Sequence, residues 1–244
     1  MSANPISVQL LNIMDQLPAE RQAEVLDFAL FLRQRSGQGN GQAIQMLNGR
    51  LAVADLPLRL YLPAMSDDEF FDFCQANRDL RIERTAQGEI IIMPPAGGET
   101  SNRNAALTTL LTTWAWRDGT GRSFDSSGGF ILPNGATRSP DAAWVRSARL
   151  ASLTPAQWRK FLPLCPDFVV ELMSPSDNLA EAQAKMEEYL ANGAMLGWLL
   201  DAEPKTAYVY HPGQPVEILQ QPTVLSGEPV LPGFTLELSY IWPA

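Results

Sequence analysis

A single carboxylate inside an apolar run constrains this chain more than any other feature. The run FVVELM carries Glu171 in its middle, and its length and β-branched residues are typical of a buried strand. Thirty residues earlier, Asp141 begins another short apolar run, DAAWV. An ionised carboxylate in a buried strand is costly unless it is paired or bound to a cation. The fold must therefore supply a partner for each acid.

A divalent cation is one such partner. Two acids on neighbouring strands repel each other, and Mg²⁺ between them removes that penalty. If the strands are adjacent, Asp141, Glu171 and the backbone carbonyl of Leu172 supply the oxygen ligands that Mg²⁺ favours. A bound ion can polarise a phosphodiester and activate water. In the alternative interpretation Asp141 ends a strand after Pro140 and Glu171 lies at an exposed strand edge.

A lysine on the next predicted helix favours the metal interpretation. Lys185 is one of two lysines after residue 160. It lies beside the apolar helical stripe Leu179, Ala182, Met186 and Tyr189. From there its stem can extend along the sheet and bring the ammonium group to the acids. The alternative is an exposed ion pair with Glu181, one turn earlier.

The composition excludes several classes of protein. With one histidine, His211, the chain cannot carry a zinc site built on several histidines, and a histidine-based triad is disfavoured. A net charge of −9 argues against a non-specific nucleic-acid coat. The middle of the chain, residues 78–160, nevertheless has an excess of basic residues, which leaves a local basic patch open.

The sequence also favours a cytoplasmic protein. No apolar run approaches the roughly 20 residues of a membrane helix. The N-terminus lacks the basic region and cleavage site of a signal peptide. Cys74 and Cys165 have no metal-binding spacing and are expected to be reduced thiols.

We expect three parts along the chain. Residues 1–36 have the pattern of a helical pair whose apolar stripe needs a docking or dimerisation partner. Residues 37–60 begin with the Gly-rich stretch GQGNGQ and are interpreted as a linker. Residues 61–244 are expected to form an α/β domain. Its expected elements are a capped helix after Ser66, a hairpin at 80–95, helices at 99–117 and 178–192, a short helix from Thr154, and strands at 123–132, 137–146, 167–172, 195–201, 206–210 and 215–219.

The order of these segments resembles the Uma-two family of restriction-endonuclease-like proteins. The resemblance covers about residues 60–240 and rests on GEIIIMPPAGGETSNRN, RSPDAAWV, PDFVVELMSPSDNLAEAQAKMEEYL and VYHPG, in that order. It implies the PD-(D/E)xK nuclease fold, in which a mixed central sheet is flanked by helices. It further implies an endonuclease that hydrolyses DNA with Mg²⁺, or with Mn²⁺ in its place.

The resemblance assigns roles to particular residues. Asp141 takes the place of the first signature acid and Glu171 that of the second, and both would bind the metal with the carbonyl of Leu172. Glu99, at the start of the first core helix, stands where nucleases of this fold often place another acid. The signature lysine position holds Met173. Relatives often carry this lysine on the following helix, which implies that role for Lys185.

Two other functions remain open from the sequence. The chain can be a catalytically silent nuclease fold that binds nucleic acid or protein, as Met173 and the acidic C-terminal third suggest. It can instead be a structural partner protein that acts through its N-terminal helices, which resemble a small helical module associated with toxin–antitoxin systems. Because nucleases that cut both strands commonly act as symmetric pairs, we expect a homodimer.

Overall fold

The computed structural model describes residues 45–47, 50–52, 58–61, 65–175 and 177–242. The chain divides into two compact units, Met1–Asp55 and Leu56–Ala244. In the first unit, β1 (Gln45–Leu47) and β2 (Arg50–Ala52) form an antiparallel hairpin inside the segment that we interpreted as a linker. The helical pair expected within residues 1–36, and the dimer interpretation that depends on it, lie outside the described residues.

A six-stranded sheet, here called the large sheet, is the centre of the second unit. Its β10 and β11 are parallel and all other neighbours are antiparallel, so the sheet is mixed as expected. The strand order is β13 (Glu217–Gln220), β12 (Thr206–Tyr210), β11 (Leu196–Asp201), β10 (Phe168–Met173), β9 (Ala142–Arg146) and β6 (Gly121–Asp125).

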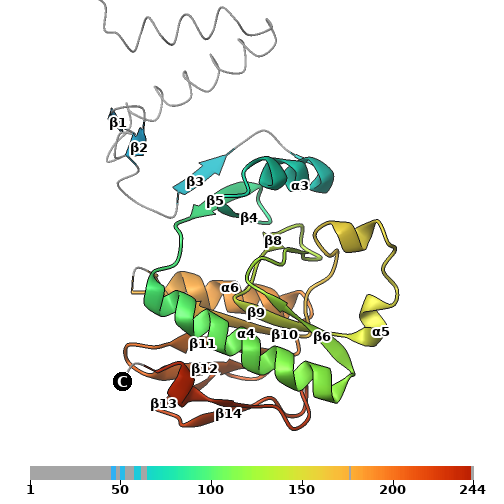
Figure 1. Cartoon of the computed structure of the whole chain (residues 1–244), viewed down its shortest axis with the longest axis vertical. Coiled ribbons are helices and arrows are strands. Elements are labelled where there is room, and N and C mark those ends of the chain that lie inside the picture. The colour runs from blue at the N-terminus through green and yellow to red at the C-terminus, as the bar shows by residue number, and fades with distance from the viewer. Residues whose placement is uncertain (1–44, 48–49, 53–57, 62–64, 176, 243–244) are drawn as a thin grey trace, which may run out of the picture. The chain divides into compact units, whose positions relative to one another are not determined.

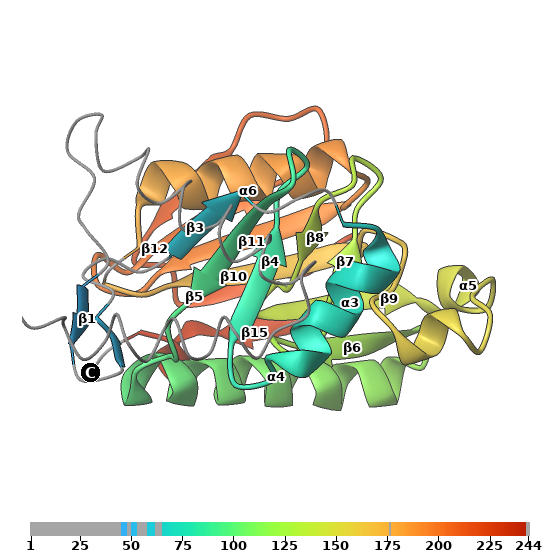
Figure 2. The same cartoon turned by 90° about the horizontal axis from the view of Figure 1, so that it is seen from above.

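One long helix covers each face of the large sheet, as Figures 1 and 2 show. On one face α4 (Gly98–Asp118) packs Leu107 and Leu111 against Trp144 and Trp198. On the other face α6 (Leu179–Ala191) buries Met186 and Tyr189. A Cβ at Gly197 would lie 2.5 Å from Met186 Cε. The absence of a side chain there lets α6 approach the sheet closely.

A smaller five-stranded sheet, here called the second sheet, lies beside the large one in the same unit. Its strands, in spatial order, are β3 (Leu58–Tyr61), β5 (Glu89–Met93), β4 (Arg81–Arg84), β8 (Thr137–Arg138) and β7 (Phe130–Ile131). The expected β4–β5 hairpin is confirmed, with Gly88 at φ 83° in its turn. Helix α3 (Asp67–Ala76) has the expected capping box between Ser66 and Glu69 and buries Phe70 against this sheet.

Two expected strands are each divided between the two sheets. The strand predicted over 123–132 is β6 in the large sheet and β7 in the second sheet, because a turn at Asp125–Gly128 redirects the chain. The strand predicted over 137–146 is β8 in the second sheet and β9 in the large sheet. Between them Pro140 has no N–H to donate to a ladder, so the pairing stops there.

The remaining elements are short. They are α5 (Ser147–Leu150), the 3₁₀ helices η1 (Gln157–Arg159) and η2 (Leu238–Tyr240), β14 (Val224–Ser226) and β15 (Thr235–Glu237). The helix predicted from Thr154 is only the single turn η1. Within the part of the chain that the structure describes, no helix has the length and apolarity needed to span a membrane.

Candidate active site

The register of β9 and β10 brings the two sequence-predicted acids to one place. Val170 pairs with Ala142, so the next step in the same register sets Glu171 opposite Asp141. Side chains alternate along a strand, and the preceding pair on the same face is Val169 and Ala143. Both belong to the core packed under α6. The two acids therefore face the helix that carries Lys185.

Asp141 is buried and accepts hydrogen bonds from three elements. Its Oδ2 accepts from the backbone N–H of Leu172 at 2.8 Å, which ties it to β10. Its Oδ1 lies 3.2 Å from Arg81 Nη1 of β4 and 3.3 Å from Asn104 Nδ2 of α4. The Asp141 carboxylate thus connects β10, β4 and α4.

Glu171 is fixed by two residues one turn apart on α6. Its Oε1 accepts from Lys185 Nζ at 2.8 Å and from the Tyr189 hydroxyl at 2.9 Å. Burial raises the pKa of Glu171 to about 7; the Lys185 charge opposes this rise, and the charges of Asp141 and Glu83 add to it. Lys185 thus lies beside Glu171, one of the two acids that it was expected to approach. Glu181, the alternative partner considered for Lys185, pairs with Arg59 at 2.5 Å.

A third buried acid, Glu83 of β4, was not predicted as a site residue. It accepts from Lys185 Nζ at 2.9 Å, from Arg138 Nη1 at 3.1 Å and from the N–H of Ser139 at 3.0 Å. Burial alone would raise the pKa of Glu83, but the charges of Lys185 and Arg138 outweigh it and lower the pKa to about 2. Lys185 is thus held between Glu83 and Glu171.

These residues form what we call the charged cluster. It contains three cations and three acids: Arg81, Arg138, Lys185, Glu83, Asp141 and Glu171. Arg138 also pairs with a fourth acid, Glu188, at 2.6 Å. It lies where the second sheet meets the large sheet, since β4 and β8 contribute from the former and β10 from the latter. The Arg81 side chain is 31% exposed, against 17% for Lys185 and 3% for Glu83. Solvent therefore reaches the cluster mainly at Arg81.

Glu99 lies apart from the cluster. Its side chain is largely exposed and pairs with Arg103 Nη2 at 2.5 Å, one turn along α4. Among the described residues, no hydrogen bond or ion pair joins Glu99 to Asp141 or Glu171. On this helix it is Asn104 that contacts Asp141. The sequence position at the helix start therefore does not place this acid among the others.

The charge alternation in β4 was the signal for the missed residues. Arg81 and Glu83 alternate with Ile82, which packs into the core under α3. Two charged residues on one face of a strand whose other face is apolar indicate a polar site on that face. Met173, at the signature lysine position, is buried beside Met186 in the core under α6.

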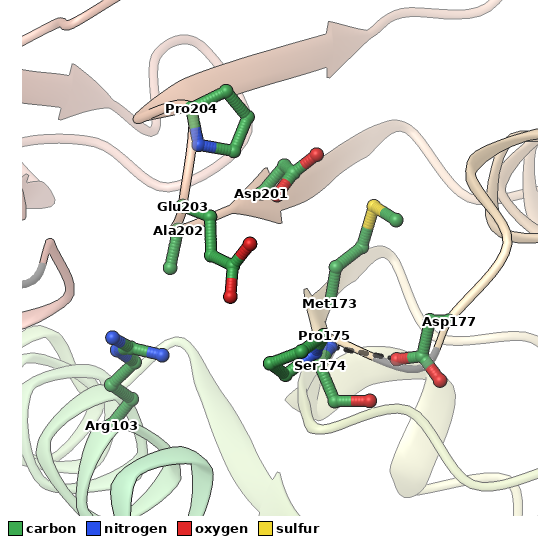
Figure 3. Close-up of a pocket in the computed structure, with 9 residues that line it drawn as sticks. All are labelled: Arg103, Met173, Ser174, Pro175, Asp177, Asp201, Ala202, Glu203 and Pro204. Carbon is green, nitrogen blue, oxygen red and sulfur yellow. Dashed lines mark hydrogen bonds between the residues drawn. The ribbon is translucent and has the colours of Figure 1, made fainter.

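A pocket of about 150 Å³ is lined by the segments that follow β10 and β11 (Figure 3). Arg103 reaches it from α4, and Asp177, Asp201 and Glu203 also line it. Three acids against one arginine make this pocket unsuited to a phosphate group.

Residues 67–239 match the model of the Uma2 family, described as "Putative restriction endonuclease". The chain also resembles a solved structure from Anabaena variabilis, described as "a putative nuclease belonging to DUF820". The two share 18% identity with a TM-score of 0.59 over 73% of this chain and 98% of that one, which shows a common fold. No curated protein matches the sequence.

Proposed function

Because this chain belongs to the Uma2 family, we propose that it is a metal-dependent nuclease that hydrolyses phosphodiester bonds in DNA. One observation carries the proposal: Asp141 and Glu171 are on one face of two adjacent strands, with Lys185 Nζ 2.8 Å from Glu171. The same three residues match the acids and the migrated lysine of the PD-(D/E)xK pattern. The family match supplies the reaction class.

The residues around Asp141 fit Mg²⁺ or Mn²⁺. Only oxygen donors are available there, as these hard cations prefer. Glu171 Oε2 accepts no hydrogen bond from the described residues. The N–H of Leu172 points at Asp141, and in an extended strand the carbonyl of the same residue points to the same side. Asp141, Glu171 and the Leu172 carbonyl would hold the ion, which supplies Lewis acidity toward a phosphoryl oxygen.

The neighbouring residues hold Glu171 and Lys185 in position and balance the Lys185 charge. Tyr189 donates to Glu171 and fixes its Oε1. Glu83 holds the Lys185 ammonium beside Glu171, where a positive charge stabilises the negative charge that develops on a reacting phosphate. Burial of Lys185 alone would lower its pKa, but the charges of Glu171 and Glu83 outweigh this effect and raise it, so Lys185 stays protonated.

A cleavage assay tests this function. Purified protein is incubated with supercoiled plasmid, single-stranded DNA or RNA in Mg²⁺, Mn²⁺ or EDTA, with Asp141→Ala as the control. We expect cleavage of DNA with either metal, and none in EDTA or with the variant. Cleavage that persists in EDTA or in the variant would identify a contaminant, and cleavage of RNA alone would change the substrate class.

A catalytically silent binding module is the second candidate. Its supporting observation is that each acid of the cluster already has a cationic side chain as partner, and no group of three His, Cys, Asp or Glu side chains among the described residues is arranged to bind a metal by itself. If this protein binds neither Mg²⁺ nor Mn²⁺ in calorimetry and cuts no nucleic acid, the result favours the binding module over the nuclease.

Replacement of Lys185 by methionine separates its charge from its bulk. We expect Lys185→Met to lower the DNA cleavage rate about 100- to 1,000-fold, the usual effect of removing one electrostatic group from an active site. Lys160→Met, which removes an exposed lysine paired with Asp68, should cleave like the wild type. Circular dichroism melts confirm that both variants fold. Normal cleavage by Lys185→Met would assign the charge-stabilising role to another residue.

Metal binding should depend on pH through Glu171. Because burial raises the pKa of this acid to about 7, a proton competes with the metal below that pH. The apparent affinity for Mn²⁺ should fall by up to about tenfold for each pH unit below 7 and level off above it. Titration calorimetry between pH 5.5 and 8.5 measures this. Glu171→Gln should bind Mn²⁺ more weakly, with a flatter pH profile; equal slopes in the two proteins would exclude Glu171 as a ligand.

A further inference from the structure

Asn104 is the residue by which α4 reaches the proposed metal site. Its Nδ2 donates to Asp141 Oδ1 at 3.3 Å. Its Oδ1 is buried and has no hydrogen-bond partner in the described part of the chain. A buried acceptor without a partner is unfavourable. The side chain that contacts Asp141 therefore carries a buried oxygen that lacks a hydrogen-bond donor.

The orientation of the amide does not remove this cost. If the amide is turned over, Asn104 Oδ1 faces Asp141 Oδ1, and two acceptors then stand against each other. A cation bound to both oxygens makes that arrangement favourable, since amide and carboxylate oxygens are ordinary ligands of Mg²⁺ and Mn²⁺. The turned-over orientation places the amide oxygen beside Asp141 Oδ1, where a cation bound to both oxygens would satisfy it.

A second unpaired atom flanks the same carboxylate. Arg81 Nε is also buried without a partner, while Arg81 Nη1 lies 3.2 Å from Asp141 Oδ1. Asp141 thus has an unpaired acceptor on its α4 side and an unpaired donor on its β4 side. A metal ion satisfies the first and an oxygen of a metal-bound phosphate satisfies the second. Both unpaired atoms therefore indicate that something binds between Asn104 and Arg81.

We propose that Asn104 is a further metal ligand, whose amide oxygen binds the ion held by Asp141. The inference rests on the proposed metal-dependent function and gives α4 the role that its Glu99 does not fill. With Asp141, Glu171 and the Leu172 carbonyl, Asn104 makes four protein oxygens. This completes the set that acidic side chains alone do not provide among the described residues.

Metal binding to the full-length protein tests the ligand role without reference to activity. Titration calorimetry with Mn²⁺ compares Asn104→Ala and Asn104→Asp with Asn102→Ala, a matched change of an exposed asparagine on the same helix. We expect Asn104→Ala to weaken binding about 10- to 100-fold. Asn104→Asp should tighten it, because a charged ligand replaces a neutral one. Asn102→Ala should bind like the wild type.

Hydration of the bound ion distinguishes a ligand from a residue that only positions Asp141. Tb³⁺ is the probe, and its luminescence lifetime in H₂O and D₂O counts coordinated waters. Asn104→Ala should gain one coordinated water relative to the wild type. Wild-type affinity and hydration in Asn104→Ala would overturn the ligand role and leave the nuclease proposal intact. Failure of the wild type to bind Mn²⁺ or Tb³⁺ would overturn both.

Discussion

Replacement of Asp141 by asparagine should abolish metal binding and DNA cleavage together. The carboxylate is buried where β9, β10, β4 and α4 meet, and its Oδ2 accepts a hydrogen bond from the backbone N–H of Leu172. Asparagine keeps the shape and one acceptor but removes the charge. We expect at least a 100-fold loss of Mn²⁺ affinity and on the order of a 1,000-fold loss of cleavage rate.

The fold of Asp141→Asn should survive, which makes the experiment interpretable. Its former partner Arg81 is 31% exposed and can be hydrated once the carboxylate charge is gone. Calorimetry with Mn²⁺, a plasmid cleavage time course and a thermal melt are measured on one preparation. Loss of cleavage with unchanged Mn²⁺ affinity would remove Asp141 from the metal site and leave it another catalytic role.

Glu83→Gln should cause the largest loss of stability. Glu83 is 2% exposed and is bound to both Lys185 and Arg138, which are themselves mostly buried. Lys185 would keep Glu171 and Arg138 would keep Glu188, but the buried negative charge shared by both cations would be lost. Removing one partner of a buried ion pair costs up to about 3–5 kcal/mol. For a unit of this size that corresponds to a melting temperature lower by about 6–20 °C. Urea unfolding and calorimetry measure the difference.

An exposed ion pair provides the matched control for Glu83. Glu181→Gln breaks the bond to Arg59, but the Glu181 side chain is 62% exposed, so the change should cost less than about 1 kcal/mol. If both variants lose the same stability, Glu83 is not the main counter-charge of Lys185 and Arg138.

The contribution of Glu83 to stability should also depend on pH, and its lowered pKa determines the direction of that dependence. The pKa is about 2 in the folded protein, below the roughly 4.3 of an unfolded glutamate. The resulting stability, about 3 kcal/mol, is fully present above pH 4.3 and is lost as the pH falls toward 2. The difference between wild type and Glu83→Gln should therefore shrink over that range.

The sequence predicted the elements whose signals are local. Ser66 and Glu69 predicted the start of α3. The helix expected at 178–192 is α6, which the Asn178 side chain caps and which Gly193 follows at φ 108°. The βαβ segment from Phe168 to Asp201 also has the predicted order of strand, helix and strand. Capping residues and apolar runs act within a few positions, so they can be identified without the tertiary structure.

The rest of the candidate site depends on contacts between distant segments. Glu83 lies 102 residues before Lys185, and Arg81 lies 60 residues before Asp141. No local sequence pattern predicts which face of the β4–β5 hairpin packs toward the large sheet. Glu99 was predicted from its place at the start of a helix, but helical rotation turns Asn104 rather than Glu99 toward Asp141. A rotation of this kind is fixed by packing of the whole helix.

The segment from β8 to β9 determines how far the protein can be dissected. It belongs to both sheets, and Asp141 lies just after the point where it passes from one to the other. A fragment that began after the hairpin would lose Arg81 and Glu83 and leave β8 without its partner β4. Even a fragment cut at residue 67, where the family match starts, would lose β3 and the bonds of Arg59 to Glu89 and Glu181. The second sheet is therefore not a removable module, and the shortest fragment that keeps all five of its strands begins before residue 58.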